Sequence, residues 1–71
     1  MNKFIERLKE ALAENNLSQN ALAQKINMSQ SVVNNYFTGK REPSLDVLIS
    51  ICKELQVSAD YLLGLTDYNN L

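Results

Sequence analysis

The 71-residue sequence predicts an all-α fold made of five short helices. Apolar residues recur at every third or fourth position, which is the spacing of one helix face, and strand-like alternation is weak. Only two glycines and one proline interrupt the chain. A serine also stands directly before each of four apolar stretches, where its side chain can accept a hydrogen bond from the first helical turn.

The helices, taken in order with their capping residues, are expected over residues 2–14, 18–26, 29–39, 44–55 and 58–64. Serines begin the last four, and glycines end the third and the fifth, because glycine readily takes the left-handed conformation that stops a helix. The residues expected to face the core share the helical spacing and are Ile5, Leu8, Leu12, Leu22, Ala23, Ile26, Val33, Tyr36 or Phe37, Leu45, Leu48, Ile49, Ile51, Cys52 and Leu55. Because the connections are short, consecutive helices must lie side by side.

Composition limits the classes of function. The chain is large enough for one domain. Cys52 is the only cysteine and histidine is absent, which excludes an internal disulfide, the usual zinc sites and histidine-based catalysis. We therefore expect no enzyme activity, no metal and no cofactor, and we expect Cys52 to be a buried, reduced thiol. No apolar run approaches the roughly 20 residues of a membrane span, so a cytoplasmic location without membrane contact is expected.

The charged residues are segregated along the chain, although the formal net charge is only −1. Residues 15–41 contain no Asp or Glu but include Lys25, Lys40 and Arg41. Residues 42–71 instead carry five acids against a single lysine. One surface can thus attract a polyanion while the rest of the molecule stays negative. The alternative is a polar middle that happens to lack acids.

Residues 19–36 carry the most informative pattern, two helices joined by a connection of only about three residues, which is short enough to hold them at a steep angle. A close crossing requires a small side chain at the contact, and Ala23 supplies it. Met28 and Val33 help to fill the wedge between the helices. The turn needs a residue that tolerates positive φ, and Asn27 is the best choice besides glycine.

This pattern and the residues around it resemble the Cro/C1-type (XRE) helix-turn-helix family of DNA-binding regulators. The segments that carry the resemblance are Leu17-Ser18-Gln19, Leu22-Ala23, Met28-Ser29, Val33, Gly39-Lys40-Arg41-Glu42-Pro43-Ser44 and 55–63. The resemblance implies a compact, lambda-repressor-like DNA-binding domain over residues 1–65, whose second and third helices form the helix-turn-helix. Residues 66–71 would be a C-terminal tail, which we expect to fray.

Two features depart from the family pattern. Asn27 stands where the turn usually holds glycine. Leu12 and Phe37 stand where family members often carry an arginine and a glutamate that pair with each other. We interpret this double exchange as an apolar contact that replaces an ion pair, which avoids the cost of removing two charges from water.

A helix in the major groove reads base edges with its first turn and a half. The polar residues expected to face outward there are Gln30, Ser31, Asn34 and Asn35. The resemblance aligns Asn34 with a position nearer the DNA backbone and the other three with base contacts. Gln and Asn side chains match the N6/N7 edge of adenine, and this helix has no arginine for guanine, so we expect an A·T-rich half-site. Val32, if exposed, could meet a thymine methyl group.

Phosphate contacts need only donors beside the groove and carry no sequence information. The expected phosphate-binding residues are Gln19, Asn20, Lys25, Thr38, Gly39, Lys40 and Arg41. So few cations imply weak binding by one copy, which a homodimer on half-sites roughly 34 Å apart would remedy. The dimer surface is expected at the C-terminal end, at Tyr61, Leu62, Leu65 and Tyr68, with Leu71 as a further candidate and core packing as the alternative for all of them.

The sequence therefore predicts a sequence-specific repressor of a phage or mobile-element kind that binds a palindromic double-stranded DNA operator as a homodimer. The alternative is an antitoxin or adaptor whose helices bind a partner protein, which exposed apolar residues in an acidic C-terminal third would suit. An enzyme is the poorest hypothesis. The chain ends soon after the fifth helix, which is compatible with its being the DNA-binding part of a longer repressor.

Overall fold

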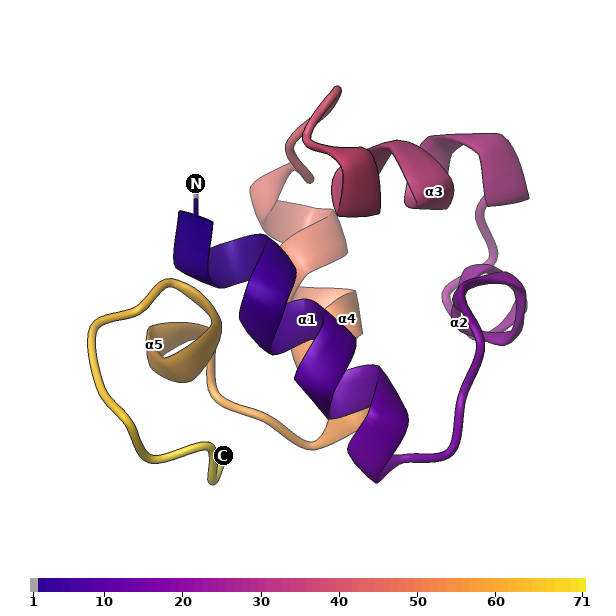
Figure 1. Cartoon of the computed structure of the whole chain (residues 1–71). Coiled ribbons are helices and arrows are strands. Elements are labelled where there is room, and N and C mark those ends of the chain that lie inside the picture. The colour runs from indigo at the N-terminus through magenta and orange to yellow at the C-terminus, as the bar shows by residue number, and fades with distance from the viewer. Residues whose placement is uncertain (1) are drawn as a thin grey trace.

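The computed structural model describes residues 2–71, which form five helices (Figure 1). In chain order they are α1 (Asn2–Glu14), α2 (Gln19–Lys25), α3 (Gln30–Thr38), α4 (Leu45–Leu55) and α5 (Ala59–Leu62). The predicted fold class is confirmed, and the helix limits agree closely with those expected. Every helix in this part of the chain is too short or too polar to pass through a lipid bilayer.

Serine side chains begin four of the helices, as predicted. The Oγ atoms of Ser18, Ser29, Ser44 and Ser58 accept hydrogen bonds of 3.0, 3.2, 3.3 and 3.1 Å from the backbone N–H three residues further on. Each bond satisfies a donor that the helix start leaves free and contributes about 1 kcal/mol to stability. At the other end of α3, Gly39 takes the left-handed conformation with φ 81°. Short-range signals therefore set the helix limits.

The helices α2 and α3 form the predicted helix-turn-helix. Their axes cross steeply, since Figure 1 shows α2 end-on where α3 lies across the view. Ala23 and Val33 are fully buried on these two helices, which pack against each other. Asn27 in the turn has φ 59°, as expected, and the Met28 N–H donates to the Ala23 carbonyl over 2.9 Å.

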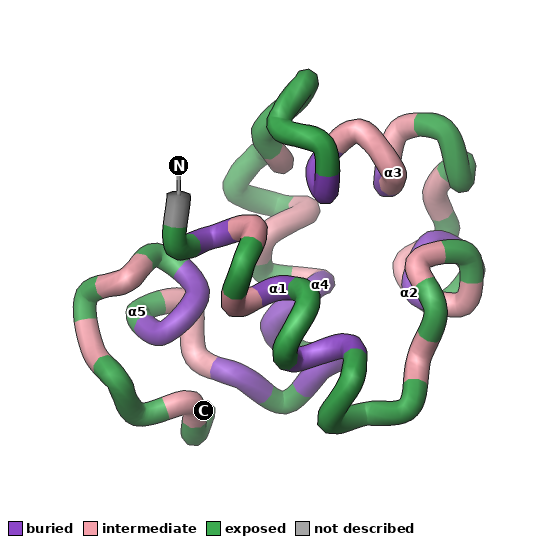
Figure 2. The backbone as a smooth tube through the Cα atoms, viewed as in Figure 1, coloured by how far each residue is buried: buried purple, intermediate pink, exposed green. Residues whose placement is uncertain are grey.

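The core is one cluster of buried side chains, and every helix of the described chain contributes to it (Figure 2). Its members are Phe4, Leu8, Ala11, Leu12, Leu22, Ala23, Val33, Tyr36, Phe37, Ile51, Cys52, Leu55, Val57, Tyr61 and Leu62. The burial expected for Cys52 is confirmed. Leu12 and Phe37 are both buried, on helices that pack against each other, which agrees with the apolar exchange. Their direct contact stays a prediction.

Two pairs of apolar residues lie elsewhere than expected. Leu45 and Ile49, expected in the core, are 78% and 52% exposed, because the other apolar residues of α4 already fill its inward side. Tyr61 and Leu62, expected on a dimer surface, are only 9% and 0% exposed. The expectation for this second pair is wrong because α5 packs against α1 and buries both side chains.

The C-terminal segment, residues 65–71, folds back along α1 instead of fraying as expected. The Arg7 guanidinium forms an ion pair of 2.8 Å with Asp67. At the start of α5, the Ser58 N–H donates to the Asn69 carbonyl over 3.1 Å. The contact between Arg7 and Asp67 joins residues 60 positions apart, so no local signal reveals it.

Candidate nucleic-acid interface

The helix α3 lies along one edge of the molecule, across the top of Figure 1 and away from α5 and the C-terminal segment. Gln30 and Ser31 in its first turn are exposed, and Asn34 and Asn35 in the next turn are half-buried. One short helix thus carries all four predicted base-reading residues, and the first two of them are exposed. Val32 is half-buried and packs against the core, so little of its side chain is free for a thymine methyl.

One carbonyl group ties the end of α3 to the loop that follows. The Asn35 carbonyl oxygen accepts hydrogen bonds from the Thr38 hydroxyl and from the Arg41 N–H, each of 3.2 Å. The Thr38 proton, expected to reach a phosphate, is therefore engaged within the protein. A Cβ atom added to Gly39 would lie 3.4 Å from Cδ1 of Ile5, so the loop also passes close to α1. The loop consequently has a fixed position beside α3.

Most of the predicted phosphate-binding residues fall into two groups, one in the loop after α3 and one at the start of α2. Lys40 and Arg41 are exposed in the loop after α3. Gln19, half-buried, and Asn20, exposed, lie in the first turn of α2. Neither α2 nor α3 has an acid in its first turn, so no carboxylate offsets the positive ends of these helices.

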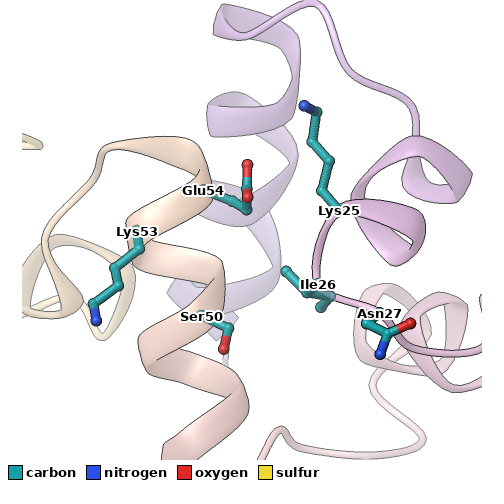
Figure 3. A pocket seen from close by; sticks show the side chains of 6 residues that line it. All are labelled: Lys25, Ile26, Asn27, Ser50, Lys53 and Glu54. Atoms are coloured by element: carbon teal, nitrogen blue, oxygen red, sulfur yellow. The ribbon is translucent and has the colours of Figure 1, made fainter.

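Lys25 lies apart from both groups. It borders a hollow of about 270 Å³ between the helix-turn-helix and α4 (Figure 3). The residues that line this hollow are Lys25, Ile26, Asn27, Ser50, Lys53 and Glu54. The Lys25 side chain extends away from Asn27 in this view. The structure thus places Lys25 beside α4 and does not bring it together with the loop cations.

The distribution of charge separates the α3 edge from the rest of the described chain. The acid-free stretch 15–41 forms α2, α3 and the start of the following loop. The one ion pair in residues 2–71, between Arg7 and Asp67, lies at the C-terminal segment. The α3 edge thus presents amides beside cations that form no ion pair within residues 2–71.

The sequence interpretation missed one feature near this edge, the exposure of Leu45 and Ile49 at the beginning of α4. A signal for it exists in the helical spacing. Both residues lie on one flank of the arc that Ile51 and Leu55 occupy, so a short chain with a small core leaves them uncovered.

A helix-turn-helix that presents polar side chains from its second helix, with exposed cations beside it, defines a DNA-binding domain. Residues 8–62 match the helix-turn-helix family. The chain therefore belongs to the XRE-type helix-turn-helix family of DNA-binding transcriptional regulators, and the resemblance seen in the sequence is confirmed.

Three relatives from Bacillus subtilis strain 168 resemble this chain. It is 34% identical over 64 residues to the uncharacterized HTH-type transcriptional regulator YobD, across 90% of this chain and 57% of the relative. It is 37% identical over 59 residues to the HTH-type transcriptional regulator ImmR, across 83% and 46%. It is 38% identical over 60 residues to the uncharacterized HTH-type transcriptional regulator YqaE, across 84% and 52%. The chain spans about half the length of these relatives.

Proposed function

We propose that this chain binds double-stranded DNA in a sequence-specific manner and represses transcription in the cytoplasm, as a homodimer on a palindromic operator of a phage or mobile element. The observation that carries the proposal is the α3 edge. Its polar side chains face away from the core, and the Asn35 carbonyl fixes the cation-bearing loop beside them. One surface therefore offers donors for bases and for phosphates at a constant spacing.

The side chains on α3 favour adenine over guanine. The amides of Gln30, Asn34 and Asn35 can donate and accept at once, which matches the N6/N7 edge of adenine. Guanine is most often read by arginine, which α3 lacks. We therefore propose an A·T-rich half-site, in which each good bidentate contact discriminates by roughly 1–3 kcal/mol.

The phosphate contacts explain why two copies are needed. Lys40 and Arg41 are exposed cations in the loop directly after α3, and the side chains of Gln19 and Asn20 add uncharged donors. A single copy with so few charges binds weakly at physiological salt. Two copies related by a two-fold axis would bind half-sites roughly 34 Å apart and double the number of contacts.

Selection from a random duplex pool, followed by gel-shift titration, tests the proposal. The wild-type chain should prefer the selected site over random duplex. The Gln30→Ala, Asn35→Ala variant should lose roughly tenfold or more of this preference for each contact removed. The bond between the Asn35 carbonyl and Arg41 uses backbone atoms, so this variant keeps the loop in place.

The matched control is Gln24→Ala, Asn70→Ala, which removes the same two amide types at exposed positions outside α3. It should retain the preference for the selected site. If the α3 variant kept full selectivity, the assignment of base reading to α3 would be wrong.

A second candidate function is that of an antitoxin or adaptor that binds a partner protein. The observation that favours it is the C-terminal segment, where Leu65 and Tyr68 are exposed although their neighbours are held by hydrogen bonds. An exposed, ordered apolar surface is typical of protein-binding sites. Under this function the wild-type chain would bind selected and random duplex alike in the same titration.

A further inference from the structure

We infer that Ile5, on α1, is a positioning residue for DNA binding, because its side chain supports the loop that carries Lys40 and Arg41. The inference rests on the proposed function, in which these two cations contact phosphates. It adds a helix to the DNA-binding machinery, since the residues assigned to bases and phosphates lie on α2, on α3 and in the loop after α3.

The contact lies between the end of the Ile5 side chain and Gly39. Gly39 ends α3 in the left-handed conformation, with φ 81°, and the loop begins there. A Cβ atom at position 39 would lie 3.4 Å from Cδ1 of Ile5, which is within van der Waals contact. The start of the loop therefore lies against α1, although it continues directly from α3.

Ile5 is itself held in place. Its side chain is half-buried and packs against the core cluster, to which Phe4 and Leu8 of the same helix belong. A β-branched side chain in a helix also has one strongly preferred χ1 rotamer. The Ile5 side chain consequently has little freedom to move away from Gly39.

The loop has few other ties to the domain. Within residues 2–71, the one backbone–backbone hydrogen bond of residues 40–43 joins the Arg41 N–H to the Asn35 carbonyl over 3.2 Å. The side chains of Lys40 and Arg41 are exposed and form no ion pair in the same part of the chain. The Asn35 carbonyl thus ties the loop to α3, and Ile5 supports it from α1.

A loop that is fixed before DNA arrives binds phosphates more tightly than a flexible one. Ordering a flexible backbone at the moment of binding costs conformational entropy, and this cost weakens the affinity. Truncating Ile5 removes no charge and no hydrogen-bond donor. If Ile5 acts by supporting the loop, the effect of its truncation on DNA binding must depend on the presence of Lys40 and Arg41.

The first test measures Kd for a duplex with one selected half-site by fluorescence anisotropy at about 50 mM salt, where affinity is high. Ile5→Ala should raise this Kd on the order of fivefold, the effect of a loop that must be ordered during binding. Ile5→Leu keeps the volume and a methyl group at the δ position, so it should stay within about twofold of wild type.

The control for a general loss of stability is Val57→Ala. Val57 is buried in the connection between α4 and α5, and it belongs to neither the helix-turn-helix nor the loop. This variant should bind the half-site with unchanged Kd. Circular dichroism at the same temperature checks that every variant is folded.

A double-mutant cycle separates positioning from a purely structural role. In the Lys40→Ala, Arg41→Ala background, Ile5→Ala should cause no further loss of affinity, because the loop then carries no cations to position. If Ile5 served only the stability of the fold, the fold-change in Kd would be the same in both backgrounds.

The outcomes separate the two proposals. An unchanged Kd for Ile5→Ala, an equal loss for Val57→Ala, or the same loss in both backgrounds overturns the inference. Each of these results leaves the proposed function intact when the wild-type chain prefers its selected half-site over random duplex. A wild-type chain without that preference overturns both.

Discussion

The guanidinium carbon of Arg7 lies 4.4 Å from the centroid of the Tyr61 ring, and the same guanidinium donates to the Tyr61 carbonyl over 2.7 Å. It also donates to the Thr66 carbonyl and pairs with Asp67. The Tyr61 hydroxyl in turn donates to Glu10 over 3.0 Å. One arginine of α1 thus joins α5 and the C-terminal segment to the rest of the domain.

Replacing this arginine should loosen the C-terminal side of the molecule. We expect Arg7→Ala to lower the free energy of unfolding by about 2 kcal/mol, because two carbonyls lose a charged donor and the Tyr61 ring loses its cation. Urea denaturation measures the change. Lys9→Ala, at an exposed position of the same helix, is the control and should stay within about 0.5 kcal/mol of wild type. Equal effects of the two substitutions would contradict a special role for Arg7.

Alkaline pH should destabilise the fold through two buried groups. Burial raises the pKa of the Cys52 thiol, and burial together with the hydrogen bond to Glu10 raises the pKa of the Tyr61 hydroxyl. A group whose pKa is raised by folding keeps its proton to a higher pH in the folded chain than in the unfolded chain. Its stabilising effect is therefore complete below the unfolded pKa and is lost as pH rises through the folded pKa.

We accordingly expect the free energy of unfolding to decline from about pH 8.5, where free thiols ionise, and more steeply above about pH 10, where free tyrosine ionises. Urea denaturation between pH 7 and pH 11 measures this profile. Tyr61→Phe should flatten the upper part, and Cys52→Ala should flatten the lower part. A Tyr61→Phe profile parallel to that of wild type would exclude the contribution of Tyr61.

In the turn between α2 and α3, the protein should be more stable with glycine than with alanine at position 27. Asn27 has φ 59°, a conformation in which a Cβ atom is strained and glycine is not. We expect Asn27→Gly to be more stable than Asn27→Ala by about 1 kcal/mol. At Lys9, in the middle of α1, Lys9→Ala should instead be more stable than Lys9→Gly by a similar amount, because alanine is the better helix former. The same order at both positions would mean that backbone strain at Asn27 is negligible.

The salt dependence of DNA binding should report the loop cations. We expect Lys40→Ala and Arg41→Ala each to reduce the slope of log K for DNA binding against log salt concentration by about 0.9 in magnitude. This is the change expected for one lost phosphate contact. Lys9→Ala, on α1, should leave the slope unchanged. Fluorescence anisotropy between 50 and 200 mM salt, the range in which such losses are large, gives the slopes. An unchanged slope for both loop variants would place the phosphate contacts elsewhere.

Local patterns were sufficient to predict the helices and the outward residues at the start of α3. A serine cap acts on the backbone only three residues away, so both partners of the bond are visible in one short stretch of sequence. The same holds for Asn27, whose conformation is set within the turn itself.

Contacts between distant residues could not be predicted in this way. Arg7 looked like one of several charges on α1, and its partner Asp67 is 60 positions away. The sequence suggested that so small a core could not also bury Tyr61 and Leu62, but α5 packs against α1 and buries both. The hydrogen bond from the Arg41 N–H to the Asn35 carbonyl likewise depends on how the chain continues after α3.

The division of labour within α3 has a consequence for engineering. Val33, Tyr36 and Phe37 are buried in the core, while Gln30 and Ser31 are exposed to solvent. Under the proposed function, the preference for one operator can be changed separately from the rest of the domain. New side chains at the solvent-facing positions of α3 would direct the protein to another DNA sequence. Its thermal stability and its contacts with the sugar–phosphate backbone would stay the same.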